Sequence, residues 1–458
     1  MRNFTLGLVL LLTQMWTKAQ VVPLEPMFDN RYGHTLTALD YSTAIAIGGV
    51  DGEVILATAE WYDFGTGQWN YAEDMTYPRV DHTTDVIGSG QLIVIGGYDG
   101  NSNLASTEIY DHDAGEFSDG PSLTTGISYH RTAHITNGGT EYILVTGGYD
   151  GFDYVATCAL LNLTTMEFET AASMNYARGS HTATVMADGR VLVTGGYNPD
   201  YDFQMVQCEI YDPATNEWTE TDPLQEGRDN HAAILMSDGT VMVSGGRFYN
   251  SDLVLYQGKT SCEIYDEANE EWTMGQPHDH GQSYHQLLLL QEYLGLYAYV
   301  SPGSTMNSGF EVETTYSPSE WISTGDEWAS FFDFGSPPSP RFRYAACIIN
   351  QTVLVTGGTG ADASTAELYL PIFSSVDEHD QYGLSIYPNP ATTRITIRKR
   401  GTGAAAYTVT DINGKTFEAG NMKGVQMDLP LKNLPEGVYH FRITENKVTS
   451  SSTFIVVH

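Results

Sequence analysis

The stretch VLVTGGY occupies residues 191–197 and returns along the chain with small changes. ILVTGGY ends at Tyr149, LIVIGGY ends at Tyr98, and VLVTGGT ends at Thr359. A phrase that returns at a constant period is typical of repeat architectures, in which one unit cannot bury its own apolar face. The spacing of this phrase is therefore the first guide to the fold.

Paired glycines mark the period of the repeat. The steps between successive pairs are 48, 51, 48, 50 and 112 residues, so the last step has room for two repeats. LYAYVSPGS, which contains Gly303, fills that step and gives seven repeats, although six remain possible if this segment is an insertion. The pairs are Gly48/Gly49, Gly96/Gly97, Gly147/Gly148, Gly195/Gly196, Gly245/Gly246 and Gly357/Gly358.

Two further marks keep their spacing from the glycines and indicate four short strands in each repeat. The first is a five-residue run such as TEIYD at 107–111 or CEIYD at 208–212. The second is an aromatic residue seven positions after the tyrosine, as in Trp69 and Trp218. Turns such as ADGR at 187–190 contain Asp-Gly, which supplies the positive φ angles of two-residue hairpins. Four-stranded antiparallel sheets arranged around an axis form a β-propeller, so an all-β propeller is predicted.

The glycine pair has a physical purpose at a strand end, because a residue without Cβ leaves room for neighbouring backbone to approach closely. Together with the period and the aromatic mark, the pair resembles the kelch repeat over roughly residues 21–372. This resemblance implies a seven-bladed kelch-type β-propeller.

The ends of the repeat array indicate how the ring closes. The last repeat stops at AELYLPI, residues 366–372, without its aromatic strand. Met27 takes the place relative to Arg31 that a Met or Leu takes in later repeats, so the residues before it have the position of an outermost strand. We therefore expect QVVPLE, residues 20–25, to complete the seventh sheet.

The first 19 residues are typical of a secretory signal peptide. They contain an early basic residue, an apolar run over residues 4–12 and the small residue Ala19. The run is too short to span a bilayer, and no other segment approaches the required length. An exported, secreted protein without a transmembrane segment is predicted.

Charge is distributed unevenly. Residues 20–376 contain 10 Lys and Arg against 49 Asp and Glu, a net charge of −39, whereas residues 377–458 contain 9 and 8. Such an acidic field repels phosphate, so nucleic acid is excluded as a partner. No DxDxDG loop is present, and the Asp-Gly pairs are explained as turns, so no calcium site is expected.

The four cysteines indicate packing rather than redox or metal chemistry. Cys158, Cys208 and Cys262 occupy one equivalent position in successive repeats, and Cys347 lies on an inner strand of the last repeat. Packed sheets lie about 10 Å apart, whereas a disulfide needs Cα atoms within about 7 Å. We expect no disulfide, no metal and no cofactor.

The pattern changes after SSVDEHDQYG, residues 374–383, to short alternating strands with Pro, Asn and Gly turns. These strands are typical of a small immunoglobulin-like β-sandwich. Residues 384–458 resemble the C-terminal sorting domain of the bacterial type IX secretion pathway. The matching residues are Leu384, Tyr387, Pro388, Asn389, Pro390, Gly414, Lys415, Leu434, Pro435, Gly437 and Tyr439.

This second resemblance implies export by the type IX machinery, followed by release or attachment at the outer-membrane surface. The final residues VVH depart from the more usual basic ending. The predicted organisation is a signal peptide at 1–19, a propeller at 20–373, a linker at 374–383 and a sorting domain at 384–458.

Arg-x-x-His recurs at the start of the inner strands. A ring of these side chains could bind an anion or a metal, but a feature present in nearly every repeat is better interpreted as structural, with Arg and His bonded to loop carbonyls. The pairs are Arg31/His34, Arg79/His82, Arg131/His134, Arg178/His181 and Arg228/His231, while Gln282 precedes His285 and Arg341 precedes Tyr344.

Asymmetry appears in the loops after the glycine pairs, which are short in the first three repeats and long in the fourth and fifth. These loops and the links between repeats open on one face, so we predict a binding rim there. Aromatic side chains suit both sugars and protein hot spots. The candidate rim residues are Tyr98, Tyr149, Phe152, Tyr197, Tyr201, Phe203, Arg247, Phe248 and Tyr249.

No catalytic motif stands out, because G-x-S-x-G, HExxH and a phosphate loop are all missing from the sequence. Some secreted kelch propellers resemble copper-radical oxidases, and Tyr129/His130 and Tyr284/His285 are the dipeptides that such a site could use. We predict a non-enzymatic surface protein that binds a protein or glycan ligand. A carbohydrate-active or copper-dependent oxidase-like enzyme is the alternative.

Overall fold

The computed structural model describes most of the chain in two compact units, one of residues 18–372 and one that contains residues 373–458. The described residues are 20–40, 42–88, 90–201, 203–236, 238–250, 255–278, 281–293, 296–306, 312–323, 328–333, 343–349, 352–359, 363–370, 385–387, 394–399, 405–411, 415–432, 434–435, 437–445 and 448–456. The predicted signal peptide and linker lie outside them.

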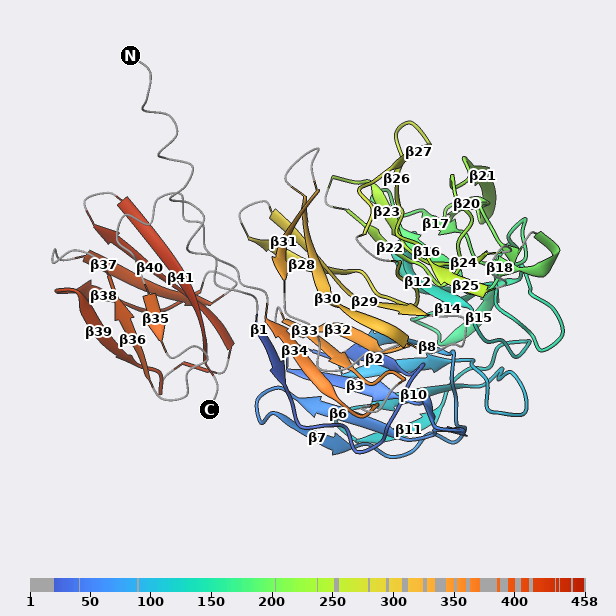
Figure 1. Ribbon diagram of the computed structural model, residues 1–458. Helices are drawn as coiled ribbons and strands as arrows, with labels where there is room; N and C mark the ends of the chain where they lie inside the picture. Colours follow the sequence, from blue (N-terminus) through green and yellow to red (C-terminus); the bar gives the residue numbers. More distant parts are fainter. Residues whose placement is uncertain are drawn as a thin grey trace, which may run out of the picture. The chain divides into compact units, whose positions relative to one another are not determined.

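The described part of the first unit forms seven four-stranded antiparallel sheets (Figure 1). In strand order, the first sheet contains β2 (Thr35–Ala38), β3 (Thr43–Ile47), β6 (Ala59–Asp63) and β7 (Gln68–Tyr71), the second β8 (Thr83–Gly88), β9 (Gln91–Ile95), β10 (Thr107–Asp111) and β11 (Glu116–Asp119), and the third β12 (Arg131–Asn137), β13 (Thr140–Thr146), β14 (Cys158–Asn162) and β15 (Glu167–Thr170). The fourth sheet contains β16 (Thr182–Val185), β17 (Val191–Thr194), β20 (Cys208–Asp212) and β21 (Glu217–Thr221), and the fifth β22 (Ala232–Leu235), β23 (Val241–Ser244), β26 (Cys262–Asp266) and β27 (Glu271–Met274). The sixth sheet contains β28 (Leu288–Tyr293), β29 (Leu296–Met306), β30 (Val312–Ser323) and β31 (Trp328–Asp333), and the seventh β32 (Ala345–Ile349), β33 (Thr352–Thr356), β34 (Ala366–Leu370) and β1 (Gln20–Pro23).

The first strand of each sheet lies toward a common axis. β2 contacts both β8 and β32, β8 contacts β12, and the contacts continue from β12 to β16 and from β16 to β22. β28 contacts β32, which joins the sixth sheet to the seventh, and the contact of β32 with β2 places the seventh sheet beside the first. The all-β propeller architecture predicted from the sequence is therefore confirmed. Among the described residues the only helical turn is the short 3-10 segment η1 (Pro199–Tyr201), and none of their helices has the length and apolar character needed to cross a bilayer.

The predicted closure of the ring is confirmed. β1 pairs antiparallel with β34, so that Val22 lies opposite Leu368 and Pro23 lies opposite Glu367. The sheet that contains Thr356 thus takes its outermost strand from the start of the described chain.

The glycine pairs make the close approach that the sequence predicted. A Cβ on Gly48, whose φ is +63°, would lie 2.4 Å from the carbonyl oxygen of Arg79 in the next sheet. A Cβ on Gly96, with a φ of +60°, would lie 2.6 Å from the carbonyl oxygen of Ile127. Any side chain at these positions would push neighbouring sheets apart.

The aromatic mark fastens each sheet to the link before it. The ring centroids of Tyr62 and Trp69 are 5.2 Å apart, and those of Tyr211 and Trp218 are 5.1 Å apart. The indole Nε1 of Trp69 donates to the backbone oxygen of Glu25 at 3.1 Å. A buried tyrosine and its partner ring therefore fill the outer part of the sheet and hold the incoming chain.

The turn at residues 187–190 differs from the two-residue hairpin predicted for it. Met186 N donates to Arg190 O at 2.8 Å across a three-residue loop, and Gly189 N donates to Met186 O at 3.1 Å. Only Gly189, with a φ of +90°, is left-handed, because an ordinary turn followed by one glycine is enough to reverse the strand here.

The second unit contains two antiparallel sheets in its described part. The first has the order β35 (Ser385–Tyr387), β36 (Arg394–Arg398) and β39 (Gln426–Pro430). The second has the order β38 (Thr416–Met422), β37 (Ala405–Asp411), β40 (Gly437–Glu445) and β41 (Val448–Val456). Ile395 and Leu429 from one sheet share a buried core with Val409 and Phe441 from the other, as in a β-sandwich.

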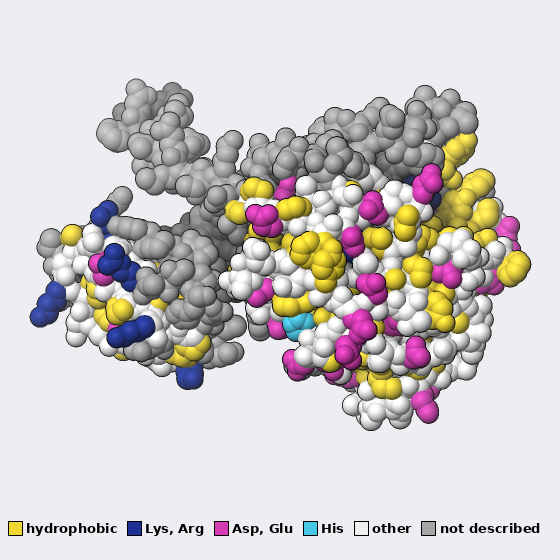
Figure 2. Space-filling model, turned by 90° about the horizontal axis from the view of Figure 1, so that it is seen from below, with side chains coloured by type: hydrophobic (Ala, Val, Ile, Leu, Met, Phe, Trp, Pro, Cys, Tyr) yellow, Lys and Arg dark blue, Asp and Glu magenta, His cyan; other side chains and the backbone are white. Residues whose placement is uncertain are grey.

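The surface reflects the charge distribution of the sequence. Figure 2 shows one face of the structure, where Asp and Glu are scattered over the propeller and Lys and Arg gather on the second unit. The propeller is therefore a strongly acidic body, as its net charge of −39 requires.

Candidate functional site

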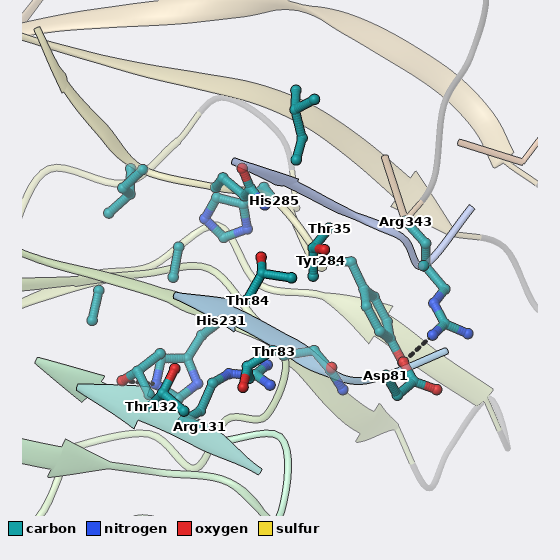
Figure 3. Close-up of a pocket in the computed structure, with 18 of the residues that line it drawn as sticks. Thr35, Asp81, Thr83, Thr84, Arg131, Thr132, His231, Tyr284, His285 and Arg343 are labelled. Atoms are coloured by element: carbon teal, nitrogen blue, oxygen red, sulfur yellow. Dashed lines mark hydrogen bonds and ion pairs between the residues drawn. The ribbon is translucent and has the colours of Figure 1, made fainter. Parts of the chain in front are cut away.

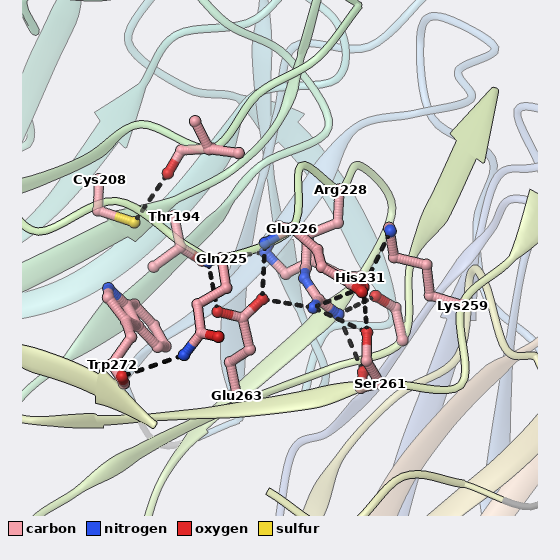
Figure 4. Close-up of polar contacts among 12 residues, drawn as sticks. Thr194, Cys208, Gln225, Glu226, Arg228, His231, Lys259, Ser261, Glu263 and Trp272 are labelled. Atoms are coloured by element: carbon pink, nitrogen blue, oxygen red, sulfur yellow. Dashed lines mark hydrogen bonds and ion pairs between the residues drawn. The ribbon is translucent and has the colours of Figure 1, made fainter. Parts of the chain in front are cut away.

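The recurring arginines are structural, as the sequence predicted. Arg228 donates to the backbone oxygens of Gly245 at 2.6 Å and Ser261 at 3.0 Å, and its Nη2 lies 2.6 Å from Oε1 of Glu263 (Figure 4). Both members of this ion pair are fully buried. The Glu263 carboxylate also accepts the backbone N–H of Gln225 at 2.7 Å. Each such arginine joins the glycine turn, the following loop and the glutamate of the EIYD run.

The recurring histidines are also structural, but their partners are hydroxyls rather than the predicted carbonyls. His82 Nε2 lies 3.1 Å from Thr35 Oγ1, and His181 Nε2 lies 2.8 Å from Thr146 Oγ1. In each case the hydroxyl belongs to the preceding sheet, so the imidazole links two blades. Burial and nearby arginines lower the pKa of both histidines well below its usual range.

The predicted Arg131/His134 pair of the third repeat is wrong, because Ile127 and His130 occupy the two positions there. Gly97 N donates to Ile127 O at 2.8 Å, the contact that an arginine carbonyl makes in neighbouring repeats, and His130 holds the histidine position. Arg131 and His134 are therefore displaced by four residues from the pattern, and His134 instead lies 3.4 Å from Asp85 Oδ1. The sequence contained a signal for this shift. Ile127 lies four residues after the apolar Leu123, just as Arg31 lies four residues after the apolar Met27.

A ring of left-handed residues surrounds the entrance of the central channel, and no sequence pattern predicted it. Each residue directly precedes the histidine or tyrosine of its repeat and has a φ between 49° and 64°. Tyr129 N donates to Asp81 O at 3.2 Å, Ser180 N to Tyr129 O at 2.9 Å, and Asn230 N to Ser180 O at 3.0 Å. Left-handed non-glycine residues persist only where the surroundings demand them. The ring consists of Gly33, Asp81, Tyr129, Ser180, Asn230, Tyr284 and Arg343.

The side chains of this ring break the symmetry of the propeller. Arg343 forms an ion pair with Asp81 across Gly33, where a Cβ would lie 2.8 Å from Nη2 of Arg343. The Asp81 carboxylate, with burial, raises the pKa of Tyr129. Burial raises the pKa of Tyr284. One side of the entrance is therefore a fixed cluster of one acid, one guanidinium and two protonated phenols.

A cavity of about 490 Å³ continues from the ring along the first strands of the sheets. Figure 3 shows Arg131, Thr132 and His231 on one side of it and Asp81, Tyr284 and Arg343 on the other. Its wall between these groups is rich in threonine hydroxyls. Such a volume is typical of pockets for small organic ligands.

The rim residues of the fourth and fifth repeats come together in a continuous row of rings. The centroids of Tyr197 and Phe203 are 6.1 Å apart, and those of Phe203 and Tyr249 are 6.3 Å apart. Tyr154 and Tyr256, which the sequence analysis missed, extend the row at 5.3 Å from Tyr197 and 5.2 Å from Tyr249. We call the full row the aromatic ridge: Tyr149, Tyr154, Tyr197, Phe203, Tyr249 and Tyr256.

Two short hairpins carry four of the six ridge residues, while Tyr149 and Tyr154 face each other across an isolated bridge. β18 (Tyr197–Asn198) pairs with β19 (Phe203–Gln204), and β24 (Arg247–Asn250) pairs with β25 (Leu255–Gly258). β19 also contacts β24, so the two long loops support each other. A third hairpin, β4 (Val50–Asp51) with β5 (Val54–Ile55), occupies the equivalent position in the first repeat.

Four predicted aromatic rim residues and Arg247 lie outside the ridge. Tyr98 donates its hydroxyl to the backbone oxygen of Gly100 at 2.7 Å, and Phe152 is 88% exposed without a ring partner among the described residues. Tyr201 meets the ring of Tyr176 edge-on at 5.7 Å. Phe248 lies 4.6 Å below the ammonium of Lys259.

Arg247 is bound within the protein rather than offered to solvent. Its Nε lies 2.8 Å from Asp229 Oδ1 and its Nη2 lies 3.2 Å from Asp229 Oδ2. Its guanidinium carbon lies 4.3 Å from the ring centre of Tyr256. These contacts, with neighbouring phenols, raise its pKa. Arg247 therefore holds the base of the ridge in place.

The rim borders the channel entrance. Tyr149 forms an antiparallel bridge with Ser128, Tyr197 with Gly179, and Arg247 with Asp229. Each of these three partners directly precedes a residue of the left-handed ring. The ridge and the cavity therefore open on the same face of the propeller, as the sequence predicted for the long loops.

The described residues contain no group of three or more His, Cys, Asp or Glu side chains arranged to hold a metal. Burial raises the pKa of the free thiols of Cys158, Cys208 and Cys347 to about 12, so they remain protonated. His130 and His285 each share their Nε2 with a hydroxyl, from Thr83 and Ser244 respectively.

Part of the sorting motif lies in the core of the second unit. Leu434 and Tyr439 are buried there, and the Tyr439 hydroxyl donates to Pro435 O at 2.8 Å. Lys415 lies 4.7 Å above the ring of Phe417, and Gly437 begins β40. Tyr387 ends β35. The remaining motif residues, Leu384, Pro388, Asn389, Pro390 and Gly414, lie outside the described residues.

Comparison with known proteins defines the class to which this architecture belongs. Residues 33–246 match the KLHDC2/KLHL20/DRC7 kelch-repeats domain, and residues 385–457 match the secretion system C-terminal sorting domain. The solved structure described as "Structure of YjhT" is similar with a TM-score of 0.49 at 14% sequence identity, over 66% of this chain and 98% of that chain. No curated protein matches the chain.

The first unit is therefore an all-β propeller that carries a kelch-repeat domain over residues 33–246. The chain also carries a C-terminal sorting domain of the type IX pathway, which engages the secretion machinery and directs export to the cell surface or the extracellular space.

Proposed function

We propose that this protein is a non-catalytic, exported binding protein that recognises a protein or glycan ligand through the aromatic ridge. The observation that carries the proposal is the continuity of the ridge over three neighbouring repeats, from Tyr149 to Tyr256. Phe203 and Tyr249 are 45% and 40% exposed and their ring centroids lie 6.3 Å apart, so they present contiguous apolar surface to solvent, as interaction sites do.

The chemistry of the ridge fits such ligands. Flat rings with polar hydroxyls stack on the apolar faces of sugars and form the centre of protein interfaces. The hairpins β18–β19 and β24–β25 and the Asp229–Arg247 ion pair support the rings from below. A rigid support reduces the conformational entropy that binding must overcome.

The test replaces Tyr197, Phe203 and Tyr249 by alanine together in the full chain. Binding to a glycan array and capture of proteins from the medium should both be compared with the unchanged protein. We expect at least a tenfold loss of affinity for whichever ligand binds, because central aromatic residues carry about 2 kcal/mol or more each.

Tyr71→Ala is the matched control, since Tyr71 is 59% exposed on the outermost strand β7 and, among the described residues, stacks on Phe28 alone. It should leave ligand binding unchanged. Full binding by the triple variant would remove the ridge from the proposal, and stoichiometric copper in the purified protein would replace it with the oxidase-like alternative.

A further inference from the structure

One cation in the propeller differs from all its neighbours. The described residues of the first unit include nine Lys and Arg side chains, and eight of them form ion pairs with Asp or Glu. Arg131 is the exception within this described part. In a unit where acidic residues outnumber basic ones almost fivefold, an arginine without a carboxylate partner needs a physical explanation.

Arg131 lies in the wall of the channel cavity, where it begins β12. Its Nη1 donates to the backbone oxygen of His130 at 2.9 Å, and no described residue accepts a hydrogen bond from its Nε or Nη2. Desolvation inside the channel lowers its pKa by more than the nearby Asp81 carboxylate raises it, so the surrounding protein compensates its charge only in part. Several guanidinium donors therefore remain available inside a space large enough for a ligand.

Neither nearby carboxylate forms an ion pair with Arg131. Asp81 is paired with Arg343. Asp85 lies outside the cavity wall, and its Oδ1 accepts from Thr132 at 3.2 Å and lies 3.4 Å from His134, while its buried Oδ2 has no partner among the described residues. The histidines of the wall are His34, His82, His231 and His285, whose pKa values are all lowered by burial, so they are neutral near pH 7. Tyr129 and Tyr284 of the wall are neutral as well, because their pKa values are raised. The wall consequently carries one net positive charge, from Arg131 and Arg343 against Asp81.

We infer that the channel cavity binds a small organic carboxylate, which the unpaired guanidinium of Arg131 holds as a counterion. The planar guanidinium fork matches a carboxylate with two parallel hydrogen bonds. A monovalent anion balances the single net charge of the wall, whereas the acidic propeller around it disfavours anions of higher charge. The wall hydroxyls of Thr83 and Thr132 already bond His130 and Asp85, so the guanidinium of Arg131 supplies the donors for the ligand (Figure 3).

This site is separate from the ligand proposed for the ridge. The ridge offers exposed rings to a macromolecule, while the cavity encloses a small anion. A failure of either proposal therefore leaves the other intact.

The test titrates the full chain with acetate and with glycolate at constant ionic strength and follows the Tm of the propeller. Ligands that bind only the folded state raise its Tm with concentration. We expect the carboxylates to raise the Tm of the unchanged protein, and we expect Arg131→Gln to weaken the apparent affinity at least tenfold. Sulfate at the same ionic strength should have a smaller effect.

Arg190→Gln is the matched control, because Arg190 is paired with Asp188 and Glu267 away from the cavity. It should respond to carboxylates like the unchanged protein. Arg131→Lys keeps the charge without the fork and should show intermediate binding, which also covers the case that Arg131→Gln does not fold. An equal carboxylate response with and without Arg131, the lack of any response, or a stronger response to sulfate would each overturn the inference.

Discussion

At the residue scale, the buried Arg–Glu pair is the feature that the kelch repeats use most consistently, and the third repeat shows what can replace it. Ile127 stands at the arginine position there, and Ala159 stands at the glutamate position. Both contribute to one apolar cluster. Loss of one member of a buried ion pair leaves an uncompensated charge, whereas replacement of both by apolar residues can be nearly neutral.

This comparison predicts strong coupling between Arg228 and Glu263. Arg228→Ile alone, or Glu263→Ala alone, should lower the free energy of unfolding by about 3–5 kcal/mol, because each leaves a buried charge without its partner. The double variant, which copies the third repeat, should lose less than the sum of the two. Urea unfolding measures all three. Additive losses in the double variant would contradict this view of the pair.

The buried histidines predict a steep loss of stability in mild acid. Six of them share Nε2 with a hydroxyl while their Nδ1 has no acceptor among the described residues, and burial lowers their pKa, for His130 to about 3. Below a pH of about 6.5 these histidines bind protons in the unfolded chain but remain neutral in the folded protein. The free energy of unfolding should therefore fall by about 1.4 kcal/mol per pH unit for each histidine.

Urea unfolding at pH 7.5 and at pH 5.5 checks this slope. His130→Gln should reduce the slope by about one histidine's share, since it removes one of the six groups. His134→Gln is the control. The Asp85 carboxylate raises the pKa of His134, so this histidine contributes to the pH dependence of stability with the opposite sign. A stability that does not change between the two pH values would show that the histidines are not neutral and buried.

At the element scale, the four-strand pattern of each repeat was predictable, because turn residues and alternating apolar positions act locally. The glycine pairs and aromatic marks even revealed which strand was missing from the last sheet. The hairpins β18–β19 and β24–β25 were predicted only as long loops. Their pairing depends on support from the adjacent loop, which no local pattern records.

The closing strand β1 should be essential for the stability of the ring. Val22→Asp places a charge where Val22 packs against the core shared by the first and last sheets, and should lower the free energy of unfolding by about 1–3 kcal/mol. It should also promote association, because β34 would become an open edge. Thermal unfolding and size-exclusion chromatography measure these effects.

Glu25→Ala is the control for this element, because the Glu25 side chain is exposed and only its backbone oxygen receives Trp69. It should leave both the Tm and the monomeric elution unchanged. Unaltered stability of Val22→Asp would mean that the ring does not depend on its N-terminal strand.

At the scale of the whole molecule, the net charge of −39 over residues 20–376 should make the propeller more stable in salt. Salt screens repulsion between exposed carboxylates within about 10 Å at 0.1 M, while the buried Arg–Glu pairs are screened much less. The Tm should therefore rise by several degrees between about 20 mM and 300 mM sodium chloride.

A variant with fewer exposed charges provides the comparison. Asp113→Asn, Glu116→Gln and Glu217→Gln together remove three exposed carboxylates and should give a smaller rise with salt. A Tm that falls with salt would show that attraction between surface ion pairs outweighs the repulsion.

The amino-acid pattern alone was sufficient for the repeat, the closing strand, the acidic character of the propeller and the sorting tail. Each of these depends on local spacing or on composition, and a periodic signal reinforces itself in every blade. The recurring Arg and His residues are structural, as their repetition in nearly every blade indicated. The exceptions are the shifted pair in the third repeat and the hydroxyl partners of the histidines.

The left-handed ring, the Asp81–Arg343 ion pair and the solitary Arg131 became visible only in the assembled propeller. Asp81 and Arg343 are 262 positions apart in the chain, yet the closed ring brings them to the two sides of Gly33. A site on a propeller axis takes one residue from each blade, so its chemistry depends on exceptions to the repeat that are far apart in sequence. Their meeting follows from closure of the circle, which is a property of the whole fold.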